Sequence, residues 1–305
     1  MPAPAFRSSG DLAADRRYVY AMDLLAEGDA VAAADLLEQT LELVPDWAAG
    51  WFALAVAREA CSDTEAAIVA LRRCAECDPA DALGAHLHLA RLGAAAPPDA
   101  PPRAYVRDLF DAYAGTFEQA LVGSLGYRAP ALIVAALAAM DPARRYSHAL
   151  DLGCGTGLMA EALAGRVDAI DGVDLSSAMV EIARAKRLYS RLAVGDVIDD
   201  LNDQPKGTYD LVTAADVLCY LGDLAPVVTA VARVLRGAGV LAFTVEAASA
   251  GDFTLRDSLR YCHGAGYVRR VADMAGLRVA ALTSADLRND RGMPVAGLVG
   301  VFTQP

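Results

Sequence analysis

The segment HALDLGCGTGLM, residues 148–159, carries the clearest structural signal in this chain. A short apolar run leads into three glycines, Gly153, Gly155 and Gly157, and a helical pattern follows. Glycines at a strand-to-helix turn let the backbone approach a ligand closely. A dinucleotide fingerprint would need glycine where Leu158 stands, and the P-loop pattern is absent. The segment therefore predicts a ligand-binding turn that belongs to neither of these two cofactor classes.

From this turn to the C-terminus, short apolar runs alternate with helical segments. This order predicts an α/β fold, a doubly wound and mostly parallel seven-stranded sheet of the Rossmann-like type with helices on both faces. The last two strands, 277–288 and 295–304, are expected to form an antiparallel hairpin that turns at 289–292 and closes the sheet edge. The five preceding strands are expected within residues 148–153, 168–174, 191–196, 209–216 and 239–246.

An acidic residue stands at the end of each of the next three predicted strands. Asp174 ends the second strand, near the position where an acidic side chain meets an adenosine ribose in doubly wound folds. One carboxylate can accept hydrogen bonds from both ribose hydroxyls. Asp196 follows the third strand, where it could accept from an adenine amino group, and Asp216 follows the fourth.

The N-terminal third contains an internal repeat of 34 residues. Pro45 and Pro79 keep this offset, as do Ala33 and Ala67. The spacing, with Trp51, is that of a tetratricopeptide repeat (TPR). We predict a small all-α TPR domain over residues 1–93, in which residues 82–93 form a truncated capping helix.

A proline-rich segment follows the repeats. Residues 94–102 contain four prolines, which favour an extended and semi-rigid spacer, so we predict an interdomain linker there. The second domain is then 103–305, and its first segment, 103–140, is expected to form a helical lid with aromatic anchors.

Composition excludes several classes of protein. The chain has 305 residues and a net charge of −12, most of it in the N-terminal third, and such acidity argues against a nucleic acid partner. The longest apolar segment, Ala131–Met140, is too short to cross a membrane, and no secretory signal is visible, so we expect a cytoplasmic protein. The six cysteines form no disulfide framework. The isolated Cys74-x-x-Cys77 pair is more typical of packing than of zinc binding, and no metal set is predicted.

At this point the motifs resemble a known family. Asp151–Gly157, Asp174, Asp196 and Tyr209–Asp216 resemble motifs I to IV of class I S-adenosylmethionine (SAM)-dependent methyltransferases. Stretches such as YVRDLFDAYAGTFE, LDLGCGTGLM and GVDLSSAM also resemble a bacterial family of methyltransferases with N-terminal TPRs. This resemblance spans almost the whole chain and is specific for fold and cofactor, but it does not identify the methyl acceptor.

The resemblance implies a set of cofactor-binding roles. The glycine turn would line the methionine part of SAM and Asp174 the ribose. Met179, Asp196 and Val197 would surround the adenine. Ala214 and Asp216 would border the methionyl group and the substrate entrance. Arg128 would bind the cofactor carboxylate, because a fixed guanidinium fork suits a carboxylate, or it could be an ordinary ion-paired surface residue. The full predicted set is Asp151, Gly153, Cys154, Gly155, Gly157, Asp174, Leu175, Met179, Asp196, Val197, Ala214, Arg128 and Tyr113.

Methyl transfer to oxygen or nitrogen can require a base, since the acceptor then loses a proton. His263, expected in a loop after the fifth strand, is the first candidate, with a surface loop histidine as the alternative. The weaker candidates are Tyr220, Tyr261, Glu246 and Asp216. The aromatic residues Tyr105 and Tyr113, together with Phe117, could form a lid or serve as packing anchors.

The favoured function is therefore methyl transfer from SAM to an unidentified acceptor, expected to be a small molecule. The TPR region would bind a protein partner, position the substrate or form a homodimer. Two alternatives remain open at this stage. One is a SAM-binding adaptor that acts through its TPR domain, and the other is different SAM chemistry on the same fold.

Overall fold

The computed structural model describes residues 7–119, 126–290 and 292–305. Within it the chain divides into two compact units, Met1–Asp108 and Leu109–Pro305. The predicted linker, residues 94–102, contains neither helix nor strand. The division lies beyond that linker, inside the helix α6 (Arg103–Tyr113). The first residues of the predicted lid therefore belong to the N-terminal unit.

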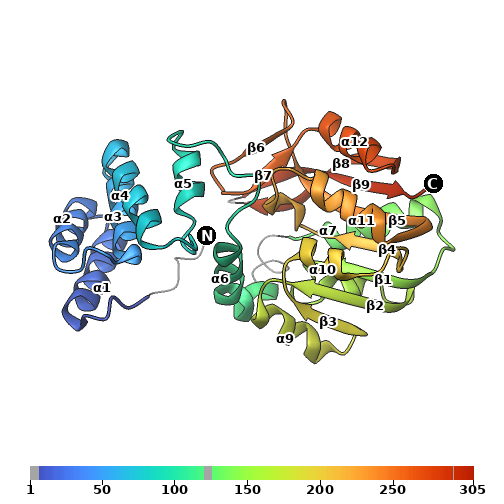
Figure 1. Cartoon of the computed structure of the whole chain (residues 1–305), viewed down its shortest axis with the longest axis horizontal. Coiled ribbons are helices and arrows are strands. Elements are labelled where there is room, and N and C mark those ends of the chain that lie inside the picture. The colour runs from blue at the N-terminus through green and yellow to red at the C-terminus, as the bar shows by residue number, and fades with distance from the viewer. Residues whose placement is uncertain (1–6, 120–125, 291) are drawn as a thin grey trace. The chain divides into compact units, whose positions relative to one another are not determined.

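Helices follow one another along the N-terminal unit, and each packs against the next (Figure 1). Asp11, Asp29 and Asp63 begin three of them by accepting hydrogen bonds from backbone N–H groups of the first turn. Ala33 and Ala67 are fully buried, which lets neighbouring helices approach closely. The assignment of this unit to the TPR class stays a prediction. The helices are α1 (Leu12–Glu27), α2 (Ala30–Leu41), α3 (Ala48–Ala60), α4 (Thr64–Cys77) and α5 (Ala85–Arg91).

Tyr105, one of the predicted aromatic anchors, also belongs to this unit. Its ring is buried against Gly84, where an added Cβ would lie 2.8 Å from the Tyr105 ring. Gly84 also has a φ of +70°, which favours glycine. Tyr105 is therefore a packing anchor, which was the alternative to a role in the lid.

The C-terminal unit is built on a sheet that has nine strands in the described residues. Strands β1 to β5 run parallel in the order β3-β2-β1-β4-β5. Strand β9 pairs antiparallel with both β5 and β8, as the predicted hairpin requires. The strands are β1 (Tyr146–Leu152), β2 (Val167–Asp174), β3 (Arg191–Val194), β4 (Tyr209–Ala214), β5 (Leu235–Ala247), β6 (Phe253–Leu255), β7 (Tyr261–His263), β8 (Arg278–Asp290) and β9 (Met293–Thr303).

Two short strands correct the prediction of seven. Strand β7 pairs with the last residues of β5, and β6 pairs with β7. Each has three residues, too few to show the alternation that reveals a strand in sequence. For this reason we expected His263 in a loop, whereas it lies on β7.

Alternate residues of each strand point to opposite faces of the sheet and pack under different helices. Leu150 and Leu241 belong to the cluster beneath α10, α11 and α12, whereas Ala149 and Val240 belong to the cluster beneath α7 and α8. Figure 1 shows the helices around the sheet. The helices of this unit are α7 (Ala129–Met140), α8 (Leu158–Ala162), α9 (Ser177–Lys186), α10 (Val197–Asp203), α11 (Ala225–Val234) and α12 (Ala265–Met274), with short 3-10 helices η1 (Ala114–Thr116) and η3 (Leu218–Tyr220).

The apolar segment Ala131–Met140 forms most of α7, where Ile133 and Leu137 are buried in the domain core. In the part of the chain that the structure describes, no helix combines the length and the apolar character that crossing a membrane requires.

Candidate functional site

The glycine turn follows β1 at the carboxyl edge of the parallel strands, where ligands bind in open α/β sheets. Gly153, Gly155 and Gly157 have φ values of +60°, +53° and +96°, a conformation that L side chains rarely adopt. Gly153 is also a site of close approach, because an added Cβ would lie 2.4 Å from Cγ2 of Val217. The turn therefore needs glycine for its backbone conformation, and at Gly153 also for close packing.

Asp174, at the end of β2, faces this turn. Its Oδ2 accepts a hydrogen bond from the backbone N–H of Gly155 at 2.8 Å, and its Oδ1 accepts from that of Ser176 at 2.9 Å. Burial raises the pKa of Asp174 above its ordinary value, with the two backbone donors acting in the opposite direction. The carboxylate is thereby fixed next to the glycine turn.

Asp151, at the end of β1, is almost fully buried beneath the turn. Its carboxylate accepts from the Tyr189 hydroxyl at 2.8 Å and from the Thr213 hydroxyl at 3.0 Å. Burial raises its pKa to about 7, because these neutral donors offset only part of the desolvation. A carboxylate in this setting would be stabilised in its ionised form by a cationic ligand.

A pocket opens between the glycine turn, the start of α8 and residues that precede α7. It brings together Asp151, Gly153, Cys154 and Gly155 from the predicted cofactor set. The residues that line it are Phe117, Tyr127, Pro130, Asp151, Gly153, Cys154, Gly155, Thr156, Leu158, Met159 and Ala215.

Arg128 does not line this pocket. Arg128 lies immediately before α7 and is exposed, and its backbone N–H donates to the carbonyl of Leu287. The preceding residue, Tyr127, lines the pocket instead and donates from its hydroxyl to the Ala215 carbonyl at 3.2 Å. The spacing of the sequence could not separate these neighbours.

The predicted adenine residues lie around the ends of β2 and β3. Met179 is fully buried on α9, while Leu175 and Val197 are half-buried. Asp196 begins α10 by accepting from the backbone N–H groups of Ile198 and Asp199. Ala214, at the end of β4, is fully buried. Their contact with a cofactor stays a prediction.

Aromatic residues of the segment 109–118 gather beside the pocket. Phe117 lines it and meets the rings of Tyr113 and Phe110 edge-on, at centroid distances of 5.6 and 6.1 Å. Phe110 in turn packs 5.4 Å from the ring of Tyr220. Tyr113 thus touches the pocket only through Phe117.

The same segment is fixed to α9 at two places. Asp111 accepts from the Ser176 hydroxyl at 2.5 Å and from the Ala178 N–H at 3.2 Å, at the start of that helix. At its end, Lys186 forms an ion pair with Glu118 at 2.6 Å. Residues 110–118 therefore lie along α9, beside the carboxylate of Asp174.

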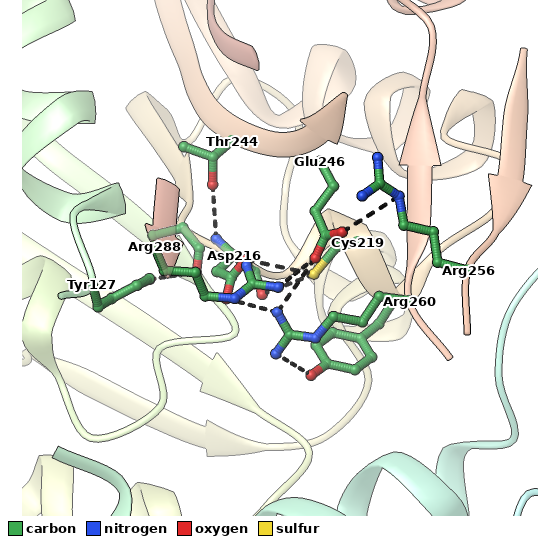
Figure 2. Close-up of polar contacts among 10 residues, drawn as sticks. Tyr127, Asp216, Cys219, Thr244, Glu246, Arg256, Arg260 and Arg288 are labelled. Atoms are coloured by element: carbon green, nitrogen blue, oxygen red, sulfur yellow. Dashed lines mark hydrogen bonds and ion pairs between the residues drawn. The ribbon is translucent and has the colours of Figure 1, made fainter. Parts of the chain in front are cut away.

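A second group of acidic residues lies where β4 and β5 end (Figure 2). Asp216 accepts from Nη1 of Arg288 at 2.9 Å and from Nη1 of Arg260 at 3.1 Å. Glu246 accepts from Nη2 of Arg288 and lies 3.6 Å from Nη1 of Arg260. Arg256 contributes a third guanidinium, 3.9 Å from Glu246. We call these five residues the arginine network.

The backbone of Asp216 is itself unusual. Its φ is +61°, a left-handed conformation that is uncommon outside glycine and that occurs often at functional sites. Its N–H donates to the Thr244 hydroxyl on β5 at 3.0 Å. This anchor aims the Asp216 carboxylate into the network.

Asp216 and Glu246 could also suggest a metal site, because Cys219 lies with them within 4.8 Å. However, Arg260 and Arg288 already neutralise both carboxylates. Burial raises the pKa of the Cys219 thiol, which opposes formation of the thiolate that a metal would need. The group therefore has the chemistry of an ion-pair network.

Two of the predicted catalytic residues stand in contrasting positions. Tyr220 lies next to the network, where its hydroxyl accepts from Nη2 of Arg260 at 2.7 Å, and burial raises its pKa. His263 is fully buried on β7, and its Nε2 lies 2.9 and 3.0 Å from the carbonyls of Leu221 and Gly222. These carbonyls place the proton on Nε2, so a role as base would fall to Nδ1. Burial lowers the pKa of His263, which favours the neutral ring.

Sequence reasoning missed the three arginines of the network and Tyr189. Arg256 and Arg260 come from a connection with little periodicity, and Arg288 comes from the hairpin. No spacing motif links them. The sequence offered one signal, which is that arginine and glutamate occur within or beside predicted apolar strands, where an unpaired charge would be costly.

Comparisons with known proteins agree with this geometry. Residues 150–243 match the family model of a methyltransferase domain. The chain is 34% identical over 98 residues to a ubiquinone biosynthesis O-methyltransferase of Alkalilimnicola ehrlichii, covering 31% of this chain and 40% of the relative. It is 31% identical over 127 residues to the protein of the same name from Burkholderia ambifaria, covering 41% and 53%. The chain thus spans about half or less of the length of these relatives.

A solved structure extends the likeness to the fold. Magnesium protoporphyrin IX methyltransferase from Synechocystis PCC 6803, determined with bound SAM, has 18% identity to this chain and a TM-score of 0.51. The match covers 67% of this chain and 97% of that one. Together with the sheet order, these findings show that the C-terminal unit has the methyltransferase fold, with residues 150–243 as the part that matches the family model.

Proposed function

We propose that the C-terminal unit binds SAM at the glycine turn and transfers its methyl group to a small molecule. The observation that carries this proposal is the arrangement of Asp151, Asp174 and the turn Gly153–Gly157 at adjoining strand ends. Asp151 is buried beside the pocket with only neutral donors, which fits the cationic character of SAM. The relatives named as O-methyltransferases support the same reaction class.

In this proposal the chain holds the cofactor at three places. The backbone of the glycine turn, with Cys154, lines the methionine part. Asp174 accepts from the ribose hydroxyls, and its bonds to Gly155 and Ser176 fix its orientation. Leu175, Met179, Asp196 and Val197 surround the adenine, and Ala214 borders the methionyl group. Arg128 is exposed and is not among the residues that line the pocket, and the ring of Tyr127 forms the wall there, with its hydroxyl proton donated to Ala215.

When bound, SAM supplies an activated methyl group on a sulfonium, so the protein mainly has to align the acceptor and exclude water. Phe110 and Phe117 supply apolar cover beside the pocket. Tyr220 stays protonated because burial raises its pKa, and its hydroxyl can donate a hydrogen bond to the acceptor. Asp216, held by two guanidiniums, is proposed to orient the acceptor. His263 is fully buried with a lowered pKa and lines neither described pocket, which argues against a role as the base.

The N-terminal unit is proposed to bind a protein partner or a second copy of the chain through its helices. Its helical pairs and its 34-residue repeat support assignment to the TPR class. Residues 1–100 carry 7 arginines and 16 acidic side chains, so a basic partner surface is favoured.

Calorimetric titration of SAM and of its demethylated product tests the cofactor site. We expect the full-length protein to bind both and Asp174→Ala to lose about tenfold to a hundredfold in affinity, because charged hydrogen bonds contribute about 1.5–3 kcal/mol. Asp168→Ala is the matched control, since Asp168 lies on the same strand β2 but is exposed in an ion pair with Arg145.

The proposal fails if the wild-type protein binds neither compound. Equal loss of affinity in both variants would show that the assignment to Asp174 is wrong. If SAM binds, a screen of small-molecule and peptide acceptors for transfer of labelled methyl then separates methyl transfer from an adaptor function.

A further inference from the structure

A cavity of about 410 Å³ lies against the arginine network. Ligand pockets for small molecules occupy about 300–1,000 Å³, so its size suits a small ligand. Glu246 and Arg288 line the cavity and also belong to the network. Asp216, the other carboxylate of the network, comes directly after Ala215, which lines the glycine-turn pocket. The cavity is lined by Glu246, Leu255, Arg256, Asp257, Ser258, Arg288, Asp290 and Val295.

The arginine network contains one more positive charge than negative. Asp216 and Glu246 receive their hydrogen bonds from Arg260 and Arg288. Arg256 approaches Glu246 only to 3.9 Å, and its Nη2 donates to the Ala247 carbonyl at 2.6 Å. Its Nη1 and Nε have no hydrogen-bond partner among the contacts of the described residues. Arg256 is therefore the surplus cation of the network, and it lines the cavity.

Ser258 provides a second polar group without a partner. Its hydroxyl oxygen is buried, yet no hydrogen bond to it exists within the described ranges. A buried hydroxyl without a hydrogen bond costs free energy, so the structure leaves a donor here that a ligand could satisfy. Leu255 and Val295 add an apolar wall to the same cavity.

We propose that this cavity binds a carboxylate group of the methyl acceptor, with Arg256 and Ser258 as its ligands and the apolar wall against its hydrocarbon part. The inference rests on the proposed methyl transfer and names the class of acceptor. The guanidinium fork of Arg256 matches a carboxylate geometrically.

Two acidic residues of the cavity favour the opposite charge. Asp257 and Asp290 are both exposed, as is Arg256, so water and salt screen all three charges. Glu246 is buried but already neutralised by Arg288. The buried polar group of the lining that has no hydrogen bond within the described ranges is therefore the Ser258 hydroxyl. Arg256 lines the same cavity, and its guanidinium can pair with a carboxylate but not with a cation.

Benzoate, benzamide and benzylamine form a set that tests the proposal, because they share a ring and differ in charge. Their binding to the full-length protein is measured by ligand-observed NMR, with the demethylated cofactor present at saturation. We expect benzoate to bind about tenfold or more tightly than benzamide, which corresponds to a charge-assisted hydrogen bond. Arg256→Gln should abolish this preference and Arg256→Lys retain part of it. Arg269→Gln on α12 makes the same charge change at an exposed residue and should leave it intact.

Equal binding of benzoate and benzamide, stronger binding of benzylamine, or no binding of any of the three would overturn the proposal. A benzoate preference that survives in Arg256→Gln would also overturn it. The calorimetric titration of the cofactor separates this failure from failure of the proposed function. A protein that binds the cofactor but shows no carboxylate preference keeps its methyltransferase assignment and loses only this acceptor class.

Discussion

Two pairs of buried carboxylates stand at the ends of neighbouring strands in one sheet, and their surroundings are opposite. Asp151 and Asp174, after β1 and β2, are held by hydroxyl and backbone N–H donors. Asp216 and Glu246, after β4 and β5, are held by guanidiniums. The first pair has no basic side chain as a hydrogen-bond partner among the described residues, and the second pair has two guanidiniums. Carboxylates thus stand in an electrostatic setting that suits a cation on one side of the sheet, and in an ion-pair network on the other.

Of the substitutions considered, removal of Arg288 should have the largest effect on the stability of the C-terminal unit. Arg288→Met leaves Asp216 and Glu246 buried with less compensation, so we expect a loss of about 3–5 kcal/mol in the free energy of unfolding of the C-terminal unit. Hydrogen exchange in β4 and β5 measures it, because both tryptophans, Trp47 and Trp51, lie in the N-terminal unit and report on that unit alone. Arg278→Met, exposed on the same strand β8, is the control. A loss below about 1 kcal/mol would mean that the network is not a major source of stability.

The glycine-turn side should respond to pH. Because burial raises the pKa of Asp151 from 3.8 to about 7, the folded protein holds this proton more tightly than the unfolded chain does. Its stabilising contribution is complete below about pH 4 and is lost as the pH rises to about 7, at up to about 1.4 kcal/mol per pH unit. The difference in stability between wild type and Asp151→Asn should follow this curve, whereas Asp168→Asn should not.

Binding of a cation would reverse the effect on Asp151. It should lower the pKa of Asp151, so that SAM binding near pH 6.5 releases a proton. Calorimetry in two buffers with different ionisation enthalpies measures this release. If binding released no proton, the cofactor would not change the pKa of Asp151, and the prediction would be wrong.

The glycine turn should tolerate no side chain at Gly153. In Gly153→Ala the new Cβ clashes with Val217, and the residue also has a positive φ. Gly165→Ala has the positive φ without the clash, because nothing lies within 4 Å of the added Cβ. We expect Gly153→Ala to cost about 1–3 kcal/mol more stability than Gly165→Ala, from overpacking. Thermal unfolding by circular dichroism compares the two. Equal costs would indicate that close approach is unimportant there.

The smallest effect is expected at Tyr189. Its hydroxyl lowers the pKa of Asp151 by a hydrogen bond, so Tyr189→Phe should move the Asp151 transition to higher pH by less than about one pH unit and cost about 1 kcal/mol. The pH dependence of stability measures both. A transition at lower pH would contradict the assigned role.

The sequence predicted the C-terminal fold and the glycine-turn half of the site because both depend on local patterns. Apolar runs locate β1 to β5 and the hairpin, and glycine spacing locates the turn. Of the other half, the carboxylates follow predicted strands and could be named, but the arginines could not, since Arg256, Arg260 and Arg288 meet Asp216 and Glu246 only through the fold. Tyr127 was missed in favour of Arg128 for the same reason, because sequence spacing does not say which of two neighbours faces a pocket. The three-residue strands β6 and β7 depend on pairing with β5 and have no pattern of their own.

The arginine network also has a consequence for the order in which the chain acquires its structure. Asp174 meets Gly155 across 19 positions, a contact available soon after both leave the ribosome. Arg288 meets Glu246 across 42 positions and Asp216 across 72, so those carboxylates have at most Arg260 as a partner until the final hairpin has been synthesised. Contacts between distant positions also form more slowly, because a longer loop has to close first. The two halves of the site should therefore mature one after the other, with the glycine turn first and the arginine network last.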